Sequence, residues 1–192
     1  MPGPEVASLL ERLALRETSV PISGQGESGF DATSGPAPAA GRGHLFGGLV
    51  AAQAVVAAGR TVPSERGLHS LHAYFLRAGR PGPDIRYQVA ELRDGGTFSV
   101  RAVRALQEQR LIFTANLGFC DPEAGISHQP EMPAAPPPEG LLDRDRERER
   151  IVGHRSAHPA IEVRMCEAPP FAGGTPSSPF QRNWIRVTGG IG

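Results

Sequence analysis

Residues 47–59, GGLVAAQAVVAAG, form the segment that most limits how this chain can fold. Two glycines open the segment, and between Leu49 and Ala58 the only polar side chain is that of Gln53. The pattern predicts a helix that ends before Pro63. A helix without a polar face is buried on all sides in a globular protein, so other elements are expected to wrap around it.

The residues after this helix predict the strands that would cover it. LHSLHAYFLRAG (68–79) and DIRYQVAEL (84–92) have strand character, and Asp94-Gly95 predicts a hairpin turn. TFSVRAVRAL (97–106), the turn QEQR and LIFTANLGF (111–119) continue the pattern. Hairpin-linked strands after one buried helix imply an antiparallel sheet curled around that helix, which is an α+β architecture.

The flanking segments are less regular. Residues 4–17 predict a short amphipathic helix, and the Gly-, Ser- and Pro-rich residues 23–43 predict a loop. Six prolines between 121 and 140 indicate a linker. DRDRERER (143–150) alternates in charge and predicts a solvated helix surface or a mobile segment. AIEVRMCEA (160–168) and NWIRVTGG (183–190) predict two further strands.

Composition excludes several classes of function. All twenty basic residues are arginine, so a phosphate-loop lysine, a Schiff-base lysine and a kinase-type lysine are excluded. The formal net charge is +0, which favours neither a nucleic-acid partner nor a membrane surface, and no apolar run is long enough to span a bilayer. The N-terminus does not resemble a secretory signal, and Cys120 and Cys166 lack a CxxC spacing. A cytoplasmic protein with free thiols is expected.

Four blocks then resemble one known family. FGGLVAAQAVVAAGRTVP, HSLHAYFLRAG, LRDGGTFSVRAVRALQ and IFTANLGF are similar, in order and spacing, to the first half of the acyl-CoA thioesterase II family. HQPEMPAAPPPEG and the strands IEVR and NWIRV resemble the linker of that family and the start of its second half. One departure is Leu49, because the family block usually reads FGGQ where this chain reads FGGL.

The resemblance implies a hotdog fold, with an antiparallel sheet wrapped around a long central helix, in an enzyme that hydrolyses fatty acyl-CoA to free fatty acid and CoA. It implies an N-terminal hotdog at 1–120, a linker at 121–159, and the opening strands of an incomplete second hotdog at 160–192. It implies no metal or organic cofactor. A homo-oligomer formed through the sheets is expected on burial grounds, because a single hotdog exposes the sheet edge and face that its partner half would cover. The family's catalytic Asp, Ser or Thr hydroxyl, and Gln belong to the second hotdog and would lie beyond Gly192, so no catalytic residue is assigned and a truncated chain is expected.

Gly47 and Gly48 are the first predicted substrate contacts. Each costs a helix interior roughly 1 kcal/mol, so a compensating gain is expected. The first turn of a helix offers unpaired N–H groups that can stabilise a thioester oxyanion, where one donor is worth roughly 3 kcal/mol. The alternative is that the glycines only let the helix approach the sheet closely. The sequence leaves both interpretations open, substrate binding and close packing.

His69, Tyr74 and Arg77 complete the predicted substrate contacts. His69 is expected to face a substrate tunnel, Tyr74 an acyl chain, and Arg77 the CoA phosphates, which suit a guanidinium fork. The alternatives are a hydrogen-bonded histidine, sheet packing by the tyrosine and an arginine without a ligand. A metal held by His69 and His72 is not expected, because residues three apart on a strand point to opposite faces.

Two rival functions are weighed beside the thioesterase. One is a hotdog module without catalytic activity that binds acyl-CoA or only self-associates, because a single hotdog leaves a sheet edge uncovered. The other is dehydration, in which a histidine is paired with a carboxylate across a dimer. No Asp or Glu stands at a position that favours such a pair.

Overall fold

The structure, a computed structural model, describes residues 3–18, 27–36, 43–153, 160–169, 171 and 180–190. The chain divides into two compact units, of which one is Glu11–Gly125 and the other combines Met1–Leu10 with Ile126–Gly192. None of the helices in these ranges is long and apolar enough to cross a membrane.

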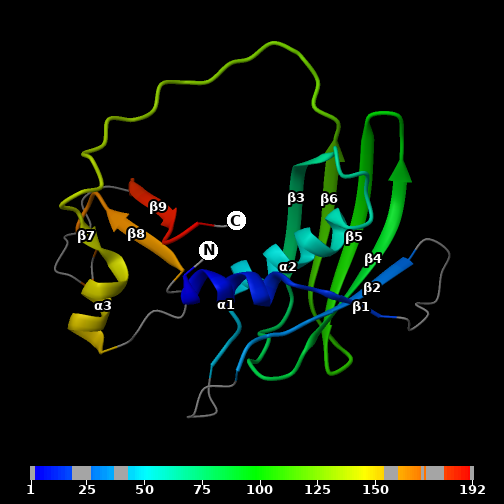
Figure 1. Ribbon diagram of the computed structural model, residues 1–192, viewed down its shortest axis with the longest axis horizontal. Helices are drawn as coiled ribbons and strands as arrows, with labels where there is room; N and C mark the ends of the chain where they lie inside the picture. The colour runs from blue at the N-terminus through cyan, green and yellow to red at the C-terminus, as the bar shows by residue number, and fades with distance from the viewer. Residues whose placement is uncertain are drawn as a thin grey trace. The chain divides into compact units, whose positions relative to one another are not determined.

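The Glu11–Gly125 unit is built on one antiparallel six-stranded sheet (Figure 1), with strand order β1-β2-β4-β5-β6-β3. Its strands are β1 (Arg16–Glu17), β2 (Glu27–Ala32), β3 (Gly67–Phe75), β4 (Ile85–Asp94), β5 (Phe98–Gln107) and β6 (Arg110–Cys120). The predicted hairpins at Asp94-Gly95 and at QEQR join β4 to β5 and β5 to β6. Along β5, residues alternate between buried and more exposed positions, as expected for a sheet with one face on a core.

Two predictions near the N-terminus are wrong in their bounds. Helix α1 (Pro4–Leu13) ends four residues before Glu17, because Arg16 and Glu17 pair with β2 instead. The segment predicted as a loop at 23–43 contains β2, where Phe30 and Ala32 are buried in the core and the strand pairs with β4. The strand was not predicted because its Gly- and Ser-containing sequence is typical of a loop. Residues 19–26 and 37–42 lie outside the described ranges.

Helix α2 (Gly47–Gly59) confirms the central prediction and packs against the sheet, with contacts to β3, β4, β5 and β6 (Figure 1). The expectation of burial on every side is half right. One face is buried, whereas Val55 and Val56 on the other face are only partly buried, because the sheet covers the helix from one side. The buried helix residues are Leu49, Val50, Gln53, Ala54, Ala57 and Ala58.

The single polar side chain of α2 is buried and fully paired. The Gln53 amide donates to the carbonyls of Arg12 (2.7 Å) and Thr33 (3.0 Å), and its oxygen accepts from the Tyr87 hydroxyl (2.8 Å). Burial raises the pKa of Tyr87, so the hydroxyl stays protonated and remains a donor. Gln53 therefore ties the helix to three segments, which accounts for a polar residue at this position.

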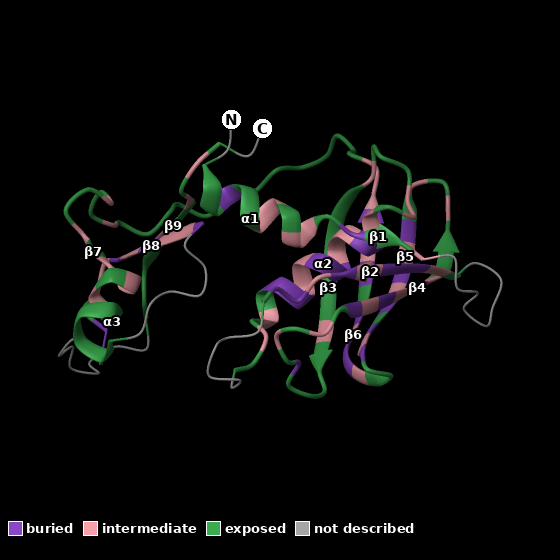
Figure 2. Cartoon of the chain, turned by 60° about the horizontal axis from the view of Figure 1, so that its bottom comes forward, coloured by how far each residue is buried: buried purple, intermediate pink, exposed green. Residues whose placement is uncertain are grey.

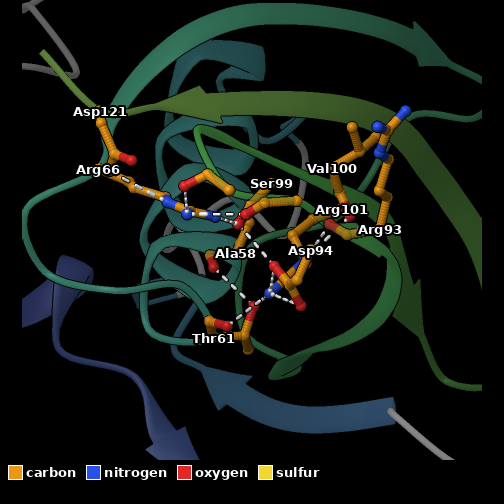
Figure 3. A network of polar contacts seen from close by, with 11 residues as sticks. Ala58, Thr61, Arg66, Arg93, Asp94, Ser99, Val100, Arg101 and Asp121 are labelled. Atoms are coloured by element: carbon orange, nitrogen blue, oxygen red, sulfur yellow. Dashed lines mark hydrogen bonds and ion pairs between the residues drawn. The ribbon is translucent and has the colours of Figure 1, made fainter. Parts of the chain in front are cut away.

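A second polar network lies at the C-terminal end of α2 (Figure 3). The guanidinium of Arg101, only 1% exposed, donates to both Asp94 oxygens (2.9 and 3.0 Å) and to the Thr61 hydroxyl (2.8 Å) and carbonyl (2.7 Å). Arg66 donates to Ser99 Oγ (2.6 Å) and Asp121 Oδ1 (3.1 Å). The network joins the end of the helix to the β4–β5 hairpin.

The second unit contains a three-stranded antiparallel sheet of order β7-β8-β9. Its elements are β7 (Leu142–Asp143), α3 (Arg144–Val152), β8 (Ile161–Met165) and β9 (Asn183–Val187). The charged run forms the solvated helix α3, which has no buried residue, is capped at its start by the Asp143 carboxylate and ends at Gly153 in the left-handed region (φ 71°). The two predicted strands correspond to β8 and β9.

The larger unit, an antiparallel sheet packed against one long helix, has the predicted α+β hotdog architecture. Its core consists of α2 residues and the inward-facing residues of the sheet.

Candidate functional site

An apolar groove of about 470 Å³ opens at the N-terminal end of α2. It lies where the start of the helix meets the end of β3 and the segment that follows it. The lining residues are His44, Leu45, Gly47, Val50, Phe75, Leu76, Arg77, Ala78, Gly79, Ile112 and Phe113. We call this the α2 groove. Its walls are mostly aliphatic and aromatic, and His44 and Arg77 are its two side chains that can carry charge.

The two glycines of the helix start are each covered by an aromatic ring. A Cβ atom on Gly47 would come within 3.0 Å of the Phe75 ring, and one on Gly48 within 2.4 Å of the Phe46 ring. Phe46 and Phe75 are themselves about half exposed, so these rings border solvent. Because the glycines have no Cβ, the two rings can pack closely against the helix start, where Gly47 lines the groove.

The first turn of α2 also presents backbone donors. The Phe46 carbonyl accepts from the N–H groups of Leu49 (3.0 Å) and Val50 (3.4 Å), whereas the N–H groups of Gly47 and Gly48 bond to no acceptor within the described ranges. No acidic residue lies in this turn, and no side chain caps it. The positive end of the helix dipole is therefore not neutralised locally.

Arg77 lies at the edge of the groove, on the exposed segment after β3. Its Nη1 donates to the Leu111 carbonyl (2.8 Å), and the N–H groups of Leu76 and Arg77 both bond to the Ile112 carbonyl. Gly79 lets the Leu45 side chain approach this segment closely, because a Cβ on it would lie 2.7 Å from that side chain. The guanidinium is thereby held beside the groove with other donors to spare.

His69 and Tyr74 lie outside the α2 groove, on β3. The His69 ring meets that of Phe98 at 6.1 Å, and the His72 ring meets that of Tyr74 at 5.0 Å. A bulge between Leu68 and Ser70 shifts the register, so the expectation that the two histidines point to opposite faces is wrong. Both rings contact exposed aromatic side chains of the outer face, away from α2.

Of the five predicted substrate contacts, Gly47 and Arg77 line the α2 groove. Gly48 follows Gly47 in the helix but is not part of the lining. His44 also lines the groove and was not among the residues selected from the sequence. Its place three residues before the glycine pair was the only available signal. In the part of the chain that the structure describes, the groove lining holds no carboxylate, and no cluster of three potential metal ligands occurs.

Comparisons with known proteins agree with this architecture. Residues 33–120 match the family model of the acyl-CoA thioesterase N-terminal domain. Acyl-coenzyme A thioesterase 8 of Homo sapiens is 37% identical over 164 residues, covering 78% of this chain and 51% of that protein. Acyl-CoA thioesterase 2 of Haemophilus influenzae is 35% identical over 156 residues, covering 76% and 54%.

A solved structure extends the match to three dimensions. The tesB protein of Mycobacterium avium subsp. paratuberculosis aligns with a TM-score of 0.71 at 31% identity, over 97% of this chain and 63% of that one. The chain spans about half the length of the curated relatives it matches. These matches, together with the sheet and its central helix, show that the chain belongs to the acyl-CoA thioesterase II family.

Proposed function

We propose that this chain belongs to an acyl-CoA thioesterase, which hydrolyses fatty acyl-CoA to free fatty acid and CoA, and that the α2 groove binds the substrate. The observation that carries the proposal is the apolar groove at an uncapped helix start, in a chain whose relatives are named acyl-CoA thioesterases. An acyl-CoA needs apolar walls for its chain, a donor for its carbonyl oxygen and a cation for its phosphates.

The helix start fits the second of these needs. When water attacks a thioester carbonyl, negative charge grows on the oxygen, and backbone N–H groups at a helix N-terminus stabilise such charge. The role is supported by the N–H groups of Gly47 and Gly48, which bond to no acceptor within the described ranges. A contact of Arg77 with the phosphates is supported by its position in the groove lining. His69 and Tyr74 remain proposed contacts, for a part of the ligand that reaches the outer face of β3.

The proposal is tested by pairing a binding measurement with a turnover measurement. Titration with a non-hydrolysable thioether analogue of a medium-chain acyl-CoA should give saturable heat. Release of CoA thiol from medium- and long-chain acyl-CoA should be slow, because none of the described lining residues is a carboxylate that could hold the attacking water. No saturable binding would refute the proposal. Turnover as fast as that of a full-length relative would show that the groove already has its catalytic group.

The second candidate is a module without catalytic activity that binds acyl-CoA or self-associates. The observation that favours it is β3, an edge strand that pairs with β6 alone among the described strands and is exposed along nearly its whole length (Figure 2). Leu71, Tyr74 and Phe75 on this strand are at least 40% exposed. We propose that a second copy pairs with this edge, giving the expected homo-oligomer.

Sedimentation of the wild type and of Leu71→Glu distinguishes the assembly states. The wild type should sediment as a dimer or larger species, and the variant should shift toward monomer, because a charge on an edge strand opposes pairing. A monomeric wild type would exclude assembly through β3.

The proposal also includes the finer sequence predictions. A role in fatty acid metabolism and a cytoplasmic location follow from an acyl-CoA substrate and from the two free thiols, Cys120 and Cys166. The division into an N-terminal hotdog at 1–120, a linker at 121–159 and the start of a second hotdog at 160–192 remains a proposal as well.

A further inference from the structure

A second cleft adjoins the α2 groove and differs from it in charge. It measures about 390 Å³ and is lined by Arg77, Ala78, Arg80, Gln107, Glu108, Arg110 and Ile112. Three of its lining residues, Arg77, Ala78 and Ile112, also line the α2 groove. The two depressions therefore adjoin, so an apolar groove lies next to a cleft that is lined by three arginines and one glutamate.

The charged cleft is held in shape by a buried amide. Gln107, 5% exposed, accepts from the Arg80 N–H (2.8 Å) and donates to the carbonyls of Arg80 (2.8 Å) and Pro83 (2.9 Å). All the polar atoms of this side chain are used to fix the backbone of residues 80–83 against the end of β5. Arg80 is thereby placed by the fold.

The opposite wall of the cleft is a hairpin turn with an unusual backbone. Glu108 and Gln109 both have positive φ (49° and 64°), a conformation that two-residue hairpins usually assign to Asn and Gly. Glu108, in this turn, and Arg110, the first residue of β6, both line the cleft. Glu108 forms an ion pair with Arg80, and both side chains are more than half exposed. Arg110 forms no ion pair with any described residue.

The charges of the cleft do not cancel. One of its three guanidinium groups is paired with a carboxylate, another donates to the Leu111 carbonyl, and the third is exposed and unpaired within the described ranges. Guanidinium groups in a cleft are suited to phosphate oxygens, which accept bidentate, charge-assisted hydrogen bonds. A ligand that fits both depressions is apolar at one end and polyanionic at the other.

We infer that the cleft of Arg77, Arg80 and Arg110 binds the phosphate groups of CoA while the α2 groove holds the acyl-pantetheine part. The inference rests on the proposed function and adds Arg80 and Arg110 to it. It also assigns a role to Glu108. This carboxylate neutralises Arg80 in the free protein and has to release it when phosphate binds.

Glu108→Gln gives the sharpest test, because it predicts a gain. Without the carboxylate, Arg80 is free for the phosphate, so CoA should bind about threefold more tightly, whereas a damaged fold would only weaken binding. Arg110→Gln should weaken CoA binding about five- to tenfold and reduce its dependence on salt. Arg104→Gln is the matched control, because Arg104 is an exposed arginine of the same unit that lines neither depression.

Three thioether probes with the same acyl chain separate the inference from the proposed function: the acyl-CoA analogue, its 3′-dephospho form, and an acyl-pantetheine that carries no phosphate. The inference expects affinity to fall in that order for the wild type and expects Arg110→Gln to leave acyl-pantetheine binding unchanged. If acyl-pantetheine binds while the acyl-CoA analogue binds equally well to the wild type, Glu108→Gln and Arg110→Gln, the cleft is not the phosphate site and the proposed function stands. If no probe binds, the proposed function falls with the inference.

Discussion

The two ends of helix α2 use arginine in opposite ways. At the C-terminal end, Arg101 is buried and its donors are matched by Asp94, Thr61 and backbone carbonyls (Figure 3). At the N-terminal end, Arg77 and Arg110 are exposed beside an apolar groove, and within the described ranges neither is paired with a carboxylate.

This difference separates a structural site from a binding site. A buried guanidinium without partners would be costly, so the network around Arg101 has to be complete for the unit to fold. The N-terminal end has no such requirement, because Gly48, Arg77 and Arg110 are exposed and solvent can satisfy their polar groups until a ligand binds. The network around Arg101 thus fixes the C-terminal end of α2 to the sheet, and the same helix forms one wall of the groove at its N-terminal end.

The largest expected effect is at the C-terminal end. Asp94→Ala leaves the buried Arg101 without its carboxylate and should lower the free energy of unfolding by about 3 kcal/mol, measured by urea denaturation. Asp84→Ala is the control, because it removes only the exposed pair with Arg16 and should cost less than about 1 kcal/mol. A loss for Asp94→Ala no greater than for the control would show that the network does not hold the unit together.

The same carboxylate predicts a pH dependence. Hydrogen bonds from Ser99 and Arg101 lower the pKa of Asp94 below its ordinary value of 3.8. The folded state therefore gains stability from Asp94 above the ordinary pKa, and this gain is lost as the pH falls through the lowered value. Between pH 5 and the acid limit, wild-type stability should fall more steeply than that of Asp94→Ala, and parallel curves would contradict the assignment.

A smaller effect is expected at the N-terminal end. Gly47→Val places a side chain against Phe75 in the α2 groove and should weaken binding of an acyl-CoA thioether about tenfold, or roughly 1.4 kcal/mol. Gly67→Val is the control, because a Cβ there meets no atom within 4 Å. Affinity is measured by calorimetry, and an unchanged affinity for Gly47→Val would show that the α2 groove is not the binding site.

The smallest effect concerns the turn beside the charged cleft. Gln109 has a left-handed backbone conformation, which glycine adopts without steric strain. Gln109→Gly should therefore raise the free energy of unfolding by about 0.5 to 1 kcal/mol. Thermal and urea unfolding would both report the gain. A loss of stability would mean that the Gln109 side chain contributes more than the backbone strain costs.

The sequence predicted the elements whose patterns are local. The apolar helix at 47–59, the hairpins at Asp94-Gly95 and QEQR and the solvated charged helix all follow from short-range periodicity and turn chemistry. Strand β2 could not be predicted in this way, because its register depends on pairing with β4, more than fifty residues away. Its glycine and serine content indicates a loop when considered alone.

The candidate site was predictable only in part, for a related reason. Gly47 and Arg77 were selected for their chemistry. The residues that complete the two depressions, His44, Arg80 and Arg110, come from two loops and the start of β6, and these segments meet only when the whole sheet has formed. The bulge that places His69 beside Phe98 has no signature in the local sequence either. Asp94 was assigned to the hairpin turn, whereas its carboxylate binds the buried Arg101.

The most direct test of the account is to locate the ligand by NMR. Titrating the protein with a thioether analogue of acyl-CoA should shift the backbone amide resonances of Gly47, Gly48, Leu76 and Arg77. Those of Gly95, Gly96 and Ser99, at the other end of α2, should stay in place. Shifts confined to the Arg101 network or to β8 and β9, with the amides of the α2 groove unmoved, would contradict the claim that the start of this helix is the acyl-CoA site.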